Sequence, residues 1–143
     1  MVVVAAFAPS SQGEAALRTA IREARRASRE LVIASHAYPI DGGELENASS
    51  DSALQALARV AARMPEHERE YLETLDVRVH ESRSRDIGDF ILNVADLEAA
   101  DLVELALRHA APIGKLTLGQ SARRVLLGTR CPVFIAKDEA AQR

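Results

Sequence analysis

Five short apolar runs alternate with helical patterns along the 143 residues, and this alternation constrains the fold more than any other feature of the chain. The runs that we expect to be strands cover residues 2–7, 30–39, 76–82, 101–107 and 131–137. Strands that alternate with helices indicate a parallel sheet with both faces covered, and right-handed crossovers then give an open, doubly wound sheet. The sequence therefore predicts an α/β fold: a single domain over residues 1–143 with a five-stranded, mostly parallel sheet.

Between these runs, apolar residues recur at the spacing of amphipathic helices. In the first helix, expected at residues 14–29, one face carries Leu17, Ala20, Ile21 and Ala24. Later helices are expected from about residue 50, and over residues 66–75, 89–99 and 120–128. Proline disrupts a helix interior but is tolerated in a first turn, so we expect a kink or a restart at Pro65.

Composition and charge exclude several classes of partner. The net charge is −3, from 18 Lys and Arg against 21 Asp and Glu, and a nucleic-acid-binding surface needs a basic face. No apolar run approaches the length of a membrane span, and the first residues lack the positive region of a signal peptide. Cys131, the single cysteine, cannot form an internal disulfide, which fits a reducing compartment. We therefore expect a cytoplasmic protein with no nucleic-acid or membrane partner.

The sequence shows no catalytic constellation. Its four histidines have no metal-ligand spacing, and no Ser-His-Asp order, Walker lysine or paired-carboxylate motif occurs. We therefore expect no metal site and no catalytic residues.

Two polar residues at strand positions each have two interpretations. Glu104 lies in the middle of an apolar strand, where a carboxylate needs a partner, so it either pairs with a basic residue or lies near an exposed end. As the alternative, Glu104 is a perturbed carboxylate beside a binding crevice. His36 ends the second strand and is either a packed, hydrogen-bonded residue or a crevice residue.

Ligands of doubly wound sheets bind beyond the carboxyl ends of the strands, where the strand order reverses. The residues expected to line that crevice follow the first, second and fourth strands, at 8–10, 36–38 and 108–110.

The chain resembles the universal stress protein family over nearly its whole length. The strongest part is "LTLGQSARRVLLGTRCPVFIAK" (116–137), which is similar to the family's usual ending, and "EAADLVELAL" (98–107) is similar to its fourth strand, with Asp101 as the shared aspartate. The resemblance implies an adenine nucleotide alpha hydrolase-like fold with strand order 3-2-1-4-5, and a role in stress response.

Family members that bind ATP carry Gly-x-x-Gly, nine residues, then Gly followed by Ser or Thr. The glycines let backbone N–H groups approach the phosphates at a helix N-terminus. With the last glycine on Gly119, the other positions fall on Ala106, His109 and Gln120, so three of the four depart from the pattern. The aspartate that usually ends the first strand is replaced by Ala8. The expectation is a protein without tight ATP binding and without a cofactor.

A remodelled site is the alternative, in which the protein is a nucleotide-binding switch or a slow ATPase. A third and weaker class is an enzyme that uses the crevice for another adenylated or anionic substrate. The residues of this vestigial or remodelled nucleotide crevice are Ala8, Ser10, Arg108, His109, Lys115, Gly119, Gln120 and Ser121.

The last expected strand is short, apolar and followed by a polar tail, and an edge strand of this kind invites pairing with a second copy. The resemblance points the same way, because family members commonly dimerise through this strand. We therefore expect a homodimer with Val133, Phe134 and Ile135 at the interface, acting through a protein partner that the sequence does not identify.

Overall fold

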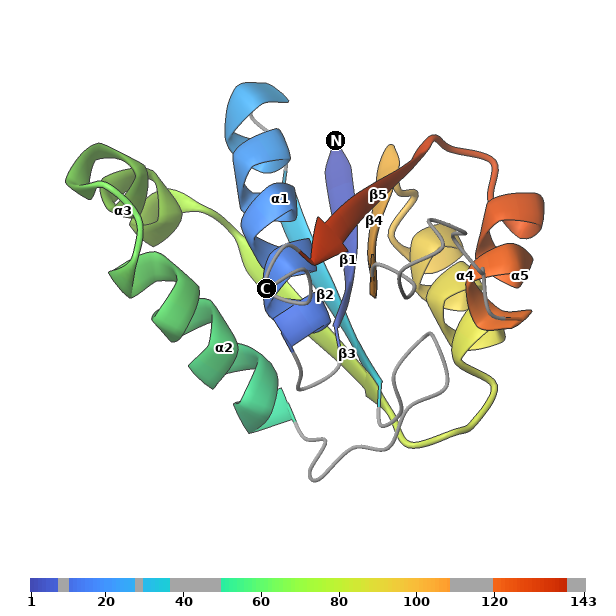
Figure 1. The fold of residues 1–143 in the computed structure, drawn as a ribbon. Coiled ribbons are helices and arrows are strands. Elements are labelled where there is room, and N and C mark those ends of the chain that lie inside the picture. The colour runs from blue at the N-terminus through green and yellow to red at the C-terminus, as the bar shows by residue number, and fades with distance from the viewer. Residues whose placement is uncertain (8–10, 28–29, 37–49, 109–119, 139–143) are drawn as a thin grey trace.

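The computed structural model describes residues 1–7, 11–27, 30–36, 50–108 and 120–138. They form one parallel sheet in the order β3-β2-β1-β4-β5, which confirms the predicted fold class and strand order (Figure 1). The strands are β1 (Val2–Phe7), β2 (Glu30–His36), β3 (Val77–Ser82), β4 (Leu102–Arg108) and β5 (Val133–Asp138). The helices are α1 (Ser11–Ala27), α2 (Ser50–Ala62), α3 (Glu66–Thr74), α4 (Ile87–Leu97) and α5 (Gln120–Gly128).

Most element bounds lie within two or three residues of those predicted. The expected restart at Pro65 is confirmed, because α2 ends at Ala62 and Pro65 stands at the N-cap position of α3. Helix α4 begins two residues earlier than expected, at Ile87. Strand β5 begins at Val133 instead of Cys131, after Pro132, which has no N–H to donate to a ladder.

The helices cover both faces of the sheet, with α1, α2 and α3 on one side and α4 and α5 on the other (Figure 1). Alternate residues along the strands supply the two cores, as the period of a strand requires. On β1, Val4 packs toward α4 and α5, whereas Val3 and Ala5 pack toward α1 and α2. All six residues of β1 are buried, so this central strand anchors both layers.

Because the strands are parallel, their carboxyl ends all lie at the same end of the sheet. The strand order reverses between β1 and β4. Residues 8–10, 37–49 and 109–119, which follow β1, β2 and β4 in the sequence, lie outside the described residues. None of the helices in the described ranges is long and apolar enough to cross a membrane.

Candidate functional site

The first turn of α5 lies against the first turn of α4, and Gly88 makes this close approach possible. A Cβ atom added at Gly88 would lie 2.9 Å from the Cβ and Cγ atoms of Arg124 and 3.2 Å from the backbone oxygen of Ser121. Two helix N-termini, each with unpaired N–H groups and a partial positive charge, are thereby brought together.

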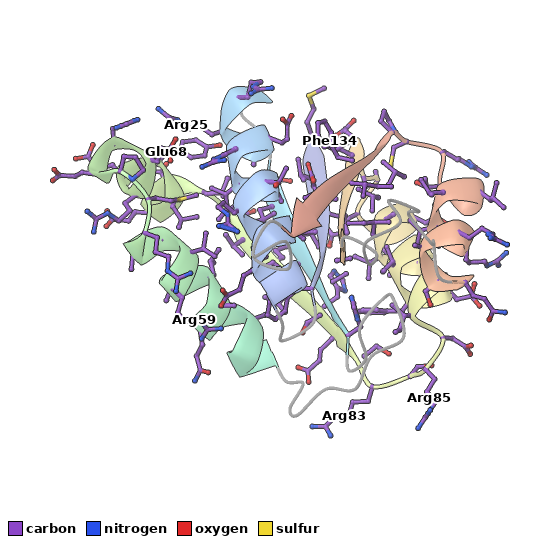
Figure 2. The ribbon with its side chains drawn as sticks, in the orientation of Figure 1. Arg25, Arg59, Glu68, Arg83, Arg85 and Phe134 are labelled. Atoms are coloured by element: carbon purple, nitrogen blue, oxygen red, sulfur yellow. The ribbon has the colours of Figure 1, made fainter. Side chains whose placement is uncertain are left out.

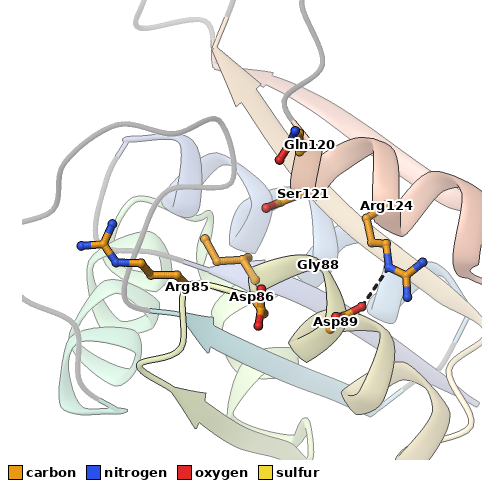
Figure 3. A pocket seen from close by; sticks show the side chains of 8 residues that line it. Arg85, Asp86, Gly88, Asp89, Gln120, Ser121 and Arg124 are labelled. Atoms are coloured by element: carbon orange, nitrogen blue, oxygen red, sulfur yellow. Dashed lines mark hydrogen bonds and ion pairs between the residues drawn. The ribbon is translucent and has the colours of Figure 1, made fainter.

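A pocket of about 230 Å³ opens between these two helix starts (Figure 3). It is lined by Arg85, Asp86, Ile87, Gly88, Asp89, Gln120, Ser121 and Arg124. The lining is predominantly polar, so the pocket suits a small polar or charged group better than an apolar one.

The charges of this pocket are mixed. The Nε atom of Arg124 donates to Oδ1 of Asp89 at 2.8 Å, and both side chains are largely exposed. Asp86 occupies the N-cap position of α4 without making a side-chain capping hydrogen bond. The pocket is thus lined by two arginines and two aspartates, of which Arg124 and Asp89 form an ion pair, and the carboxylates offset the attraction that the arginines and helix N-termini exert on an anion.

The structure brings together only part of the crevice expected from the sequence. Gln120 and Ser121 both line the pocket, as the first two residues of α5. Arg108 is the last residue of β4, at the carboxyl end of the strand. The remaining predicted crevice residues, Ala8, Ser10, His109, Lys115 and Gly119, lie outside the described residues.

Sequence reasoning missed the contribution of the connection between β3 and α4 and of the first turn of α4. Arg85, Asp86, Gly88 and Asp89 all line the pocket, and they lie in the stretch "SRSRDIGD" after the third strand. A signal for them existed, because every segment that follows a parallel strand leaves the sheet at the carboxyl ends of the strands, and the segment after the third strand does so too.

Glu104 corrects one structural expectation. It is fully buried, with an exposed fraction of 0%, and neither carboxyl oxygen has a hydrogen-bond partner in the described part of the chain. The predicted pairing with a basic residue, or a place near an exposed end, is therefore wrong. Burial, reinforced by the negative charge of Glu23, raises the pKa of Glu104 to about 8. Its neighbours in register lie on the α1 side of the sheet, away from the pocket, so it is not a pocket carboxylate either.

His36 is buried at the end of β2, with an exposed fraction of 2%, and it interacts with another group. This agrees with the packed interpretation of this histidine. Among the residues that the structure describes, no cluster of three or more His, Cys, Asp or Glu side chains could hold a metal ion.

The three residues predicted for a dimer interface differ in how they lie on β5. Val133 and Ile135 are partly buried and pack against the core on the α4 and α5 side. Phe134 points to the α1 side and is 48% exposed, beside α1 in Figure 2. Within the described residues β5 pairs with β4 alone, so it forms an edge of the sheet.

Comparisons with known proteins agree with this architecture. The family model described as the universal stress protein family matches residues 1–137. A universal stress protein of Mycolicibacterium smegmatis (strain ATCC 700084 / mc(2)155) is 28% identical over 139 residues, covering 95% of this chain and 97% of that protein.

Solved structures show the same fold. The structure of a universal stress protein from Archaeoglobus fulgidus is 25% identical, with a TM-score of 0.63, and the match covers 95% of this chain and 97% of that one. A universal stress protein solved in complex with cAMP is 17% identical, with a TM-score of 0.65 and coverage of 96% and 97%. The family match over residues 1–137, on a five-stranded sheet of order 3-2-1-4-5, shows that this chain belongs to the universal stress protein family.

Proposed function

We propose that this protein is a cytoplasmic stress-response protein that acts as a homodimer through protein partners, without tight ATP binding. Membership of the universal stress protein family supports the stress-response role. The single cysteine supports a reducing compartment. The observation that carries the ATP part of the proposal is the pair of carboxylates in the pocket at the start of α5.

Asp86 and Asp89 line the pocket into which the first turn of α5 opens. A polyphosphate bound at that helix start would bring several negative charges close to these two carboxylates, and the repulsion would oppose the helix N-terminus. Arg124 is already paired with Asp89, so using it for a phosphate means breaking that ion pair. Gln120 stands where the glycine pattern of ATP-binding family members has Ser or Thr, and its longer amide side chain lines the pocket.

The homodimer is supported by the exposed edge of the sheet. The outer side of β5 presents backbone groups that no strand of the described chain pairs with, and Phe134 is half-exposed beside them. A two-fold axis next to this edge would place β5 antiparallel to β5 of a second copy, which satisfies these backbone groups and buries both phenyl rings. Such a two-fold interface forms between two copies of this chain, and the dimer itself needs no other protein.

The ATP part is tested by calorimetric titration with Mg-ATP up to millimolar concentration. The wild-type protein is expected to give no heat of binding. The matched control is the triple variant Ala106→Gly, His109→Gly, Gln120→Ser, which restores the complete glycine pattern in front of α5. Heat in the triple variant alone would show that these three positions remove the affinity and that Asp86 and Asp89 are not sufficient to prevent binding, whereas micromolar binding by the wild-type protein would contradict the proposal.

A nucleotide-binding switch or slow ATPase is the second candidate, and one observation favours it. Ser121 places a hydroxyl group in the pocket at the start of α5, and Arg85 and Arg124 line the same pocket. If the wild-type protein binds Mg-ATP, the release of inorganic phosphate from the complex distinguishes a slow ATPase from a nucleotide-binding switch. A steady release indicates an ATPase, and a stable complex indicates a switch.

A further inference from the structure

Glu104 occupies an unusual place one strand in from the edge of the sheet. In the parallel register it lies between Ala5 of β1 and Phe134 of β5. Its neighbours along β4, Val103 and Leu105, pack on the α4 and α5 side, so the Glu104 side chain lies beneath α1. A carboxyl group thus lies in a layer built otherwise of aliphatic and aromatic side chains.

The groups around Glu104 do not compensate a negative charge. Helix α1 contributes Glu23, a second acid, whose own ion pair is with Arg26 at 3.3 Å. Strands β1 and β5 contribute Ala5 and Phe134, which are uncharged. No basic side chain in the described residues reaches either carboxyl oxygen of Glu104. The buried site therefore holds the neutral acid and disfavours the carboxylate.

On one side of Glu104, a single strand, β5, separates β4 from the edge of the sheet. Neighbouring strands lie about 4.8 Å apart, which is within the reach of a glutamate side chain that turns toward its neighbour. β5 is the outermost strand on that side, and Phe134 occupies the position directly opposite Glu104. Because the Phe134 ring is already 48% exposed, it can turn outward without leaving a buried site.

We propose that Glu104 and Phe134 form a pH-dependent switch at the β5 edge. With Glu104 protonated, the carboxyl group stays beneath α1 and Phe134 covers it. When Glu104 gives its proton to the solvent, the carboxylate turns toward the β5 margin, displaces Phe134 and loosens β5, and the association of two copies through this edge weakens. The association step rests on the proposed dimer, whereas the movement of Glu104 and Phe134 within one chain does not.

The pH range of the switch follows from proton linkage. The covered carboxyl has a pKa of about 8, and a solvated glutamate ionises near pH 4.3. Between these two values, opening releases one proton, so the open fraction grows about tenfold for each pH unit and levels off above about pH 8. A rise in pH therefore opens the edge and a fall in pH closes it.

Hydrogen exchange of the β5 backbone amides, corrected for the intrinsic exchange rate, tests the switch within one chain. Between pH 5 and 7 the protection of β5 in the wild-type protein is expected to fall about tenfold per pH unit. The variant Glu104→Gln keeps the shape of the side chain and cannot ionise, so its protection should not change with pH. Equal pH dependence in the two proteins would overturn the proposal.

Strand β3, at the opposite edge of the sheet, is the internal control. A slope of the same size in β3 would mean that the proton is linked to unfolding of the whole domain, and the local switch would be wrong. If Glu104→Gln does not fold, NMR titration of the wild-type Glu104 carboxyl carbon and the Phe134 ring replaces the comparison. The two signals should then move with one midpoint, and different midpoints would overturn the switch.

The association step is measured by sedimentation of the wild-type protein and Glu104→Gln at pH 6 and pH 8. A dimer dissociation constant that rises with pH in the wild-type protein alone supports the coupling, and an equal change in both proteins contradicts it. A chain that stays monomeric at both pH values would overturn the proposed dimer and the association step together. The exchange experiment would still decide whether Glu104 moves Phe134.

Discussion

The carboxylate of Asp101 accepts a hydrogen bond from the backbone N–H of Val2 at 2.7 Å, joining residues that are 99 positions apart. The backbone N–H of Asp101 donates in return to the carbonyl oxygen of Val2 at 2.8 Å. This pair lies just before β4 and at the first residue of β1, so the two central strands are joined where they begin. Asp101, the aspartate that resembles the family's shared residue, thus has a structural role here. It lies at the amino ends of the strands, whereas the pocket lies at their carboxyl ends.

Replacing Asp101 with alanine is expected to lower the free energy of unfolding by about 1 to 2 kcal/mol, because a charged acceptor is lost from the N–H of Val2. Asp101→Asn should cost less, since its amide oxygen can still accept this hydrogen bond. Urea denaturation of the three proteins measures the difference. Equal losses in the two variants would mean that the negative charge, rather than the hydrogen bond, stabilises this strand start.

The two glycines that face a neighbouring helix should respond differently to alanine. At Gly88 the new Cβ would lie 2.9 Å from the Cβ atom of Arg124, which cannot move without its backbone, so α4 and α5 must separate. At Gly128 the nearest atom is the Cδ1 of Leu92, at 2.7 Å, and this end of a flexible side chain can rotate away. We expect Gly88→Ala to cost about 1 to 3 kcal/mol and Gly128→Ala to be nearly neutral, measured by thermal unfolding.

The spacing of apolar residues was sufficient to predict the fold class. Apolar residues recur with different periods in strands and in helices, and both periods can be read from a single sequence. The restart at Pro65 was equally predictable, since it follows from the missing N–H of proline. The order of the strands came from the resemblance to a family and not from periodicity. Prediction was least accurate at the exact ends of elements, as at the start of β5.

The candidate site was predicted less completely than the fold. Gln120 and Ser121 were predicted from the resemblance to the family's glycine pattern, whose last positions fall at the start of α5. Arg85 and Asp89 were missed: the topology could have placed the segment after β3 at the carboxyl ends of the strands, but its approach to α5 depends on how closely two helices pack at Gly88, which no local pattern encodes. The isolation of Glu104 was unpredictable for a related reason: whether a buried charge has a partner depends on contacts between distant segments.

The proposed interface on β5 predicts that Phe134→Asp yields monomers in sedimentation velocity, because the new carboxylate would lie at the edge that two copies share. Leu127→Asp is the matched control, since Leu127 is 82% exposed on α5 and the change is of the same kind. We expect Leu127→Asp to remain dimeric. A dimer that survives Phe134→Asp would move the interface away from β5.

The ion pairs at the end of α4 predict a pH-dependent contribution to stability. Glu98 receives hydrogen bonds from Arg78 and contacts Nε2 of His80 at 2.9 Å, where β3 and α4 meet. The hydrogen bonds from Arg78, and then from His80, lower the pKa of Glu98 below its usual value. A carboxyl group whose pKa is depressed by folding stabilises the protein above its unfolded pKa, near 4.3, and this stabilisation is lost as the pH falls through the folded value.

Glu98→Gln should therefore lower the free energy of unfolding by about 1 kcal/mol at pH 7, a modest figure because Arg78 is partly exposed to solvent. The difference from the wild-type protein should shrink below about pH 4, where the wild-type carboxylate also takes up a proton. Urea denaturation at pH 7, 5 and 3 measures the trend, with Glu73→Gln, a change of the same kind at an exposed position of α3, as the control. A difference that stays constant across this range would mean that Glu98 stabilises the domain by packing, and not through its charge.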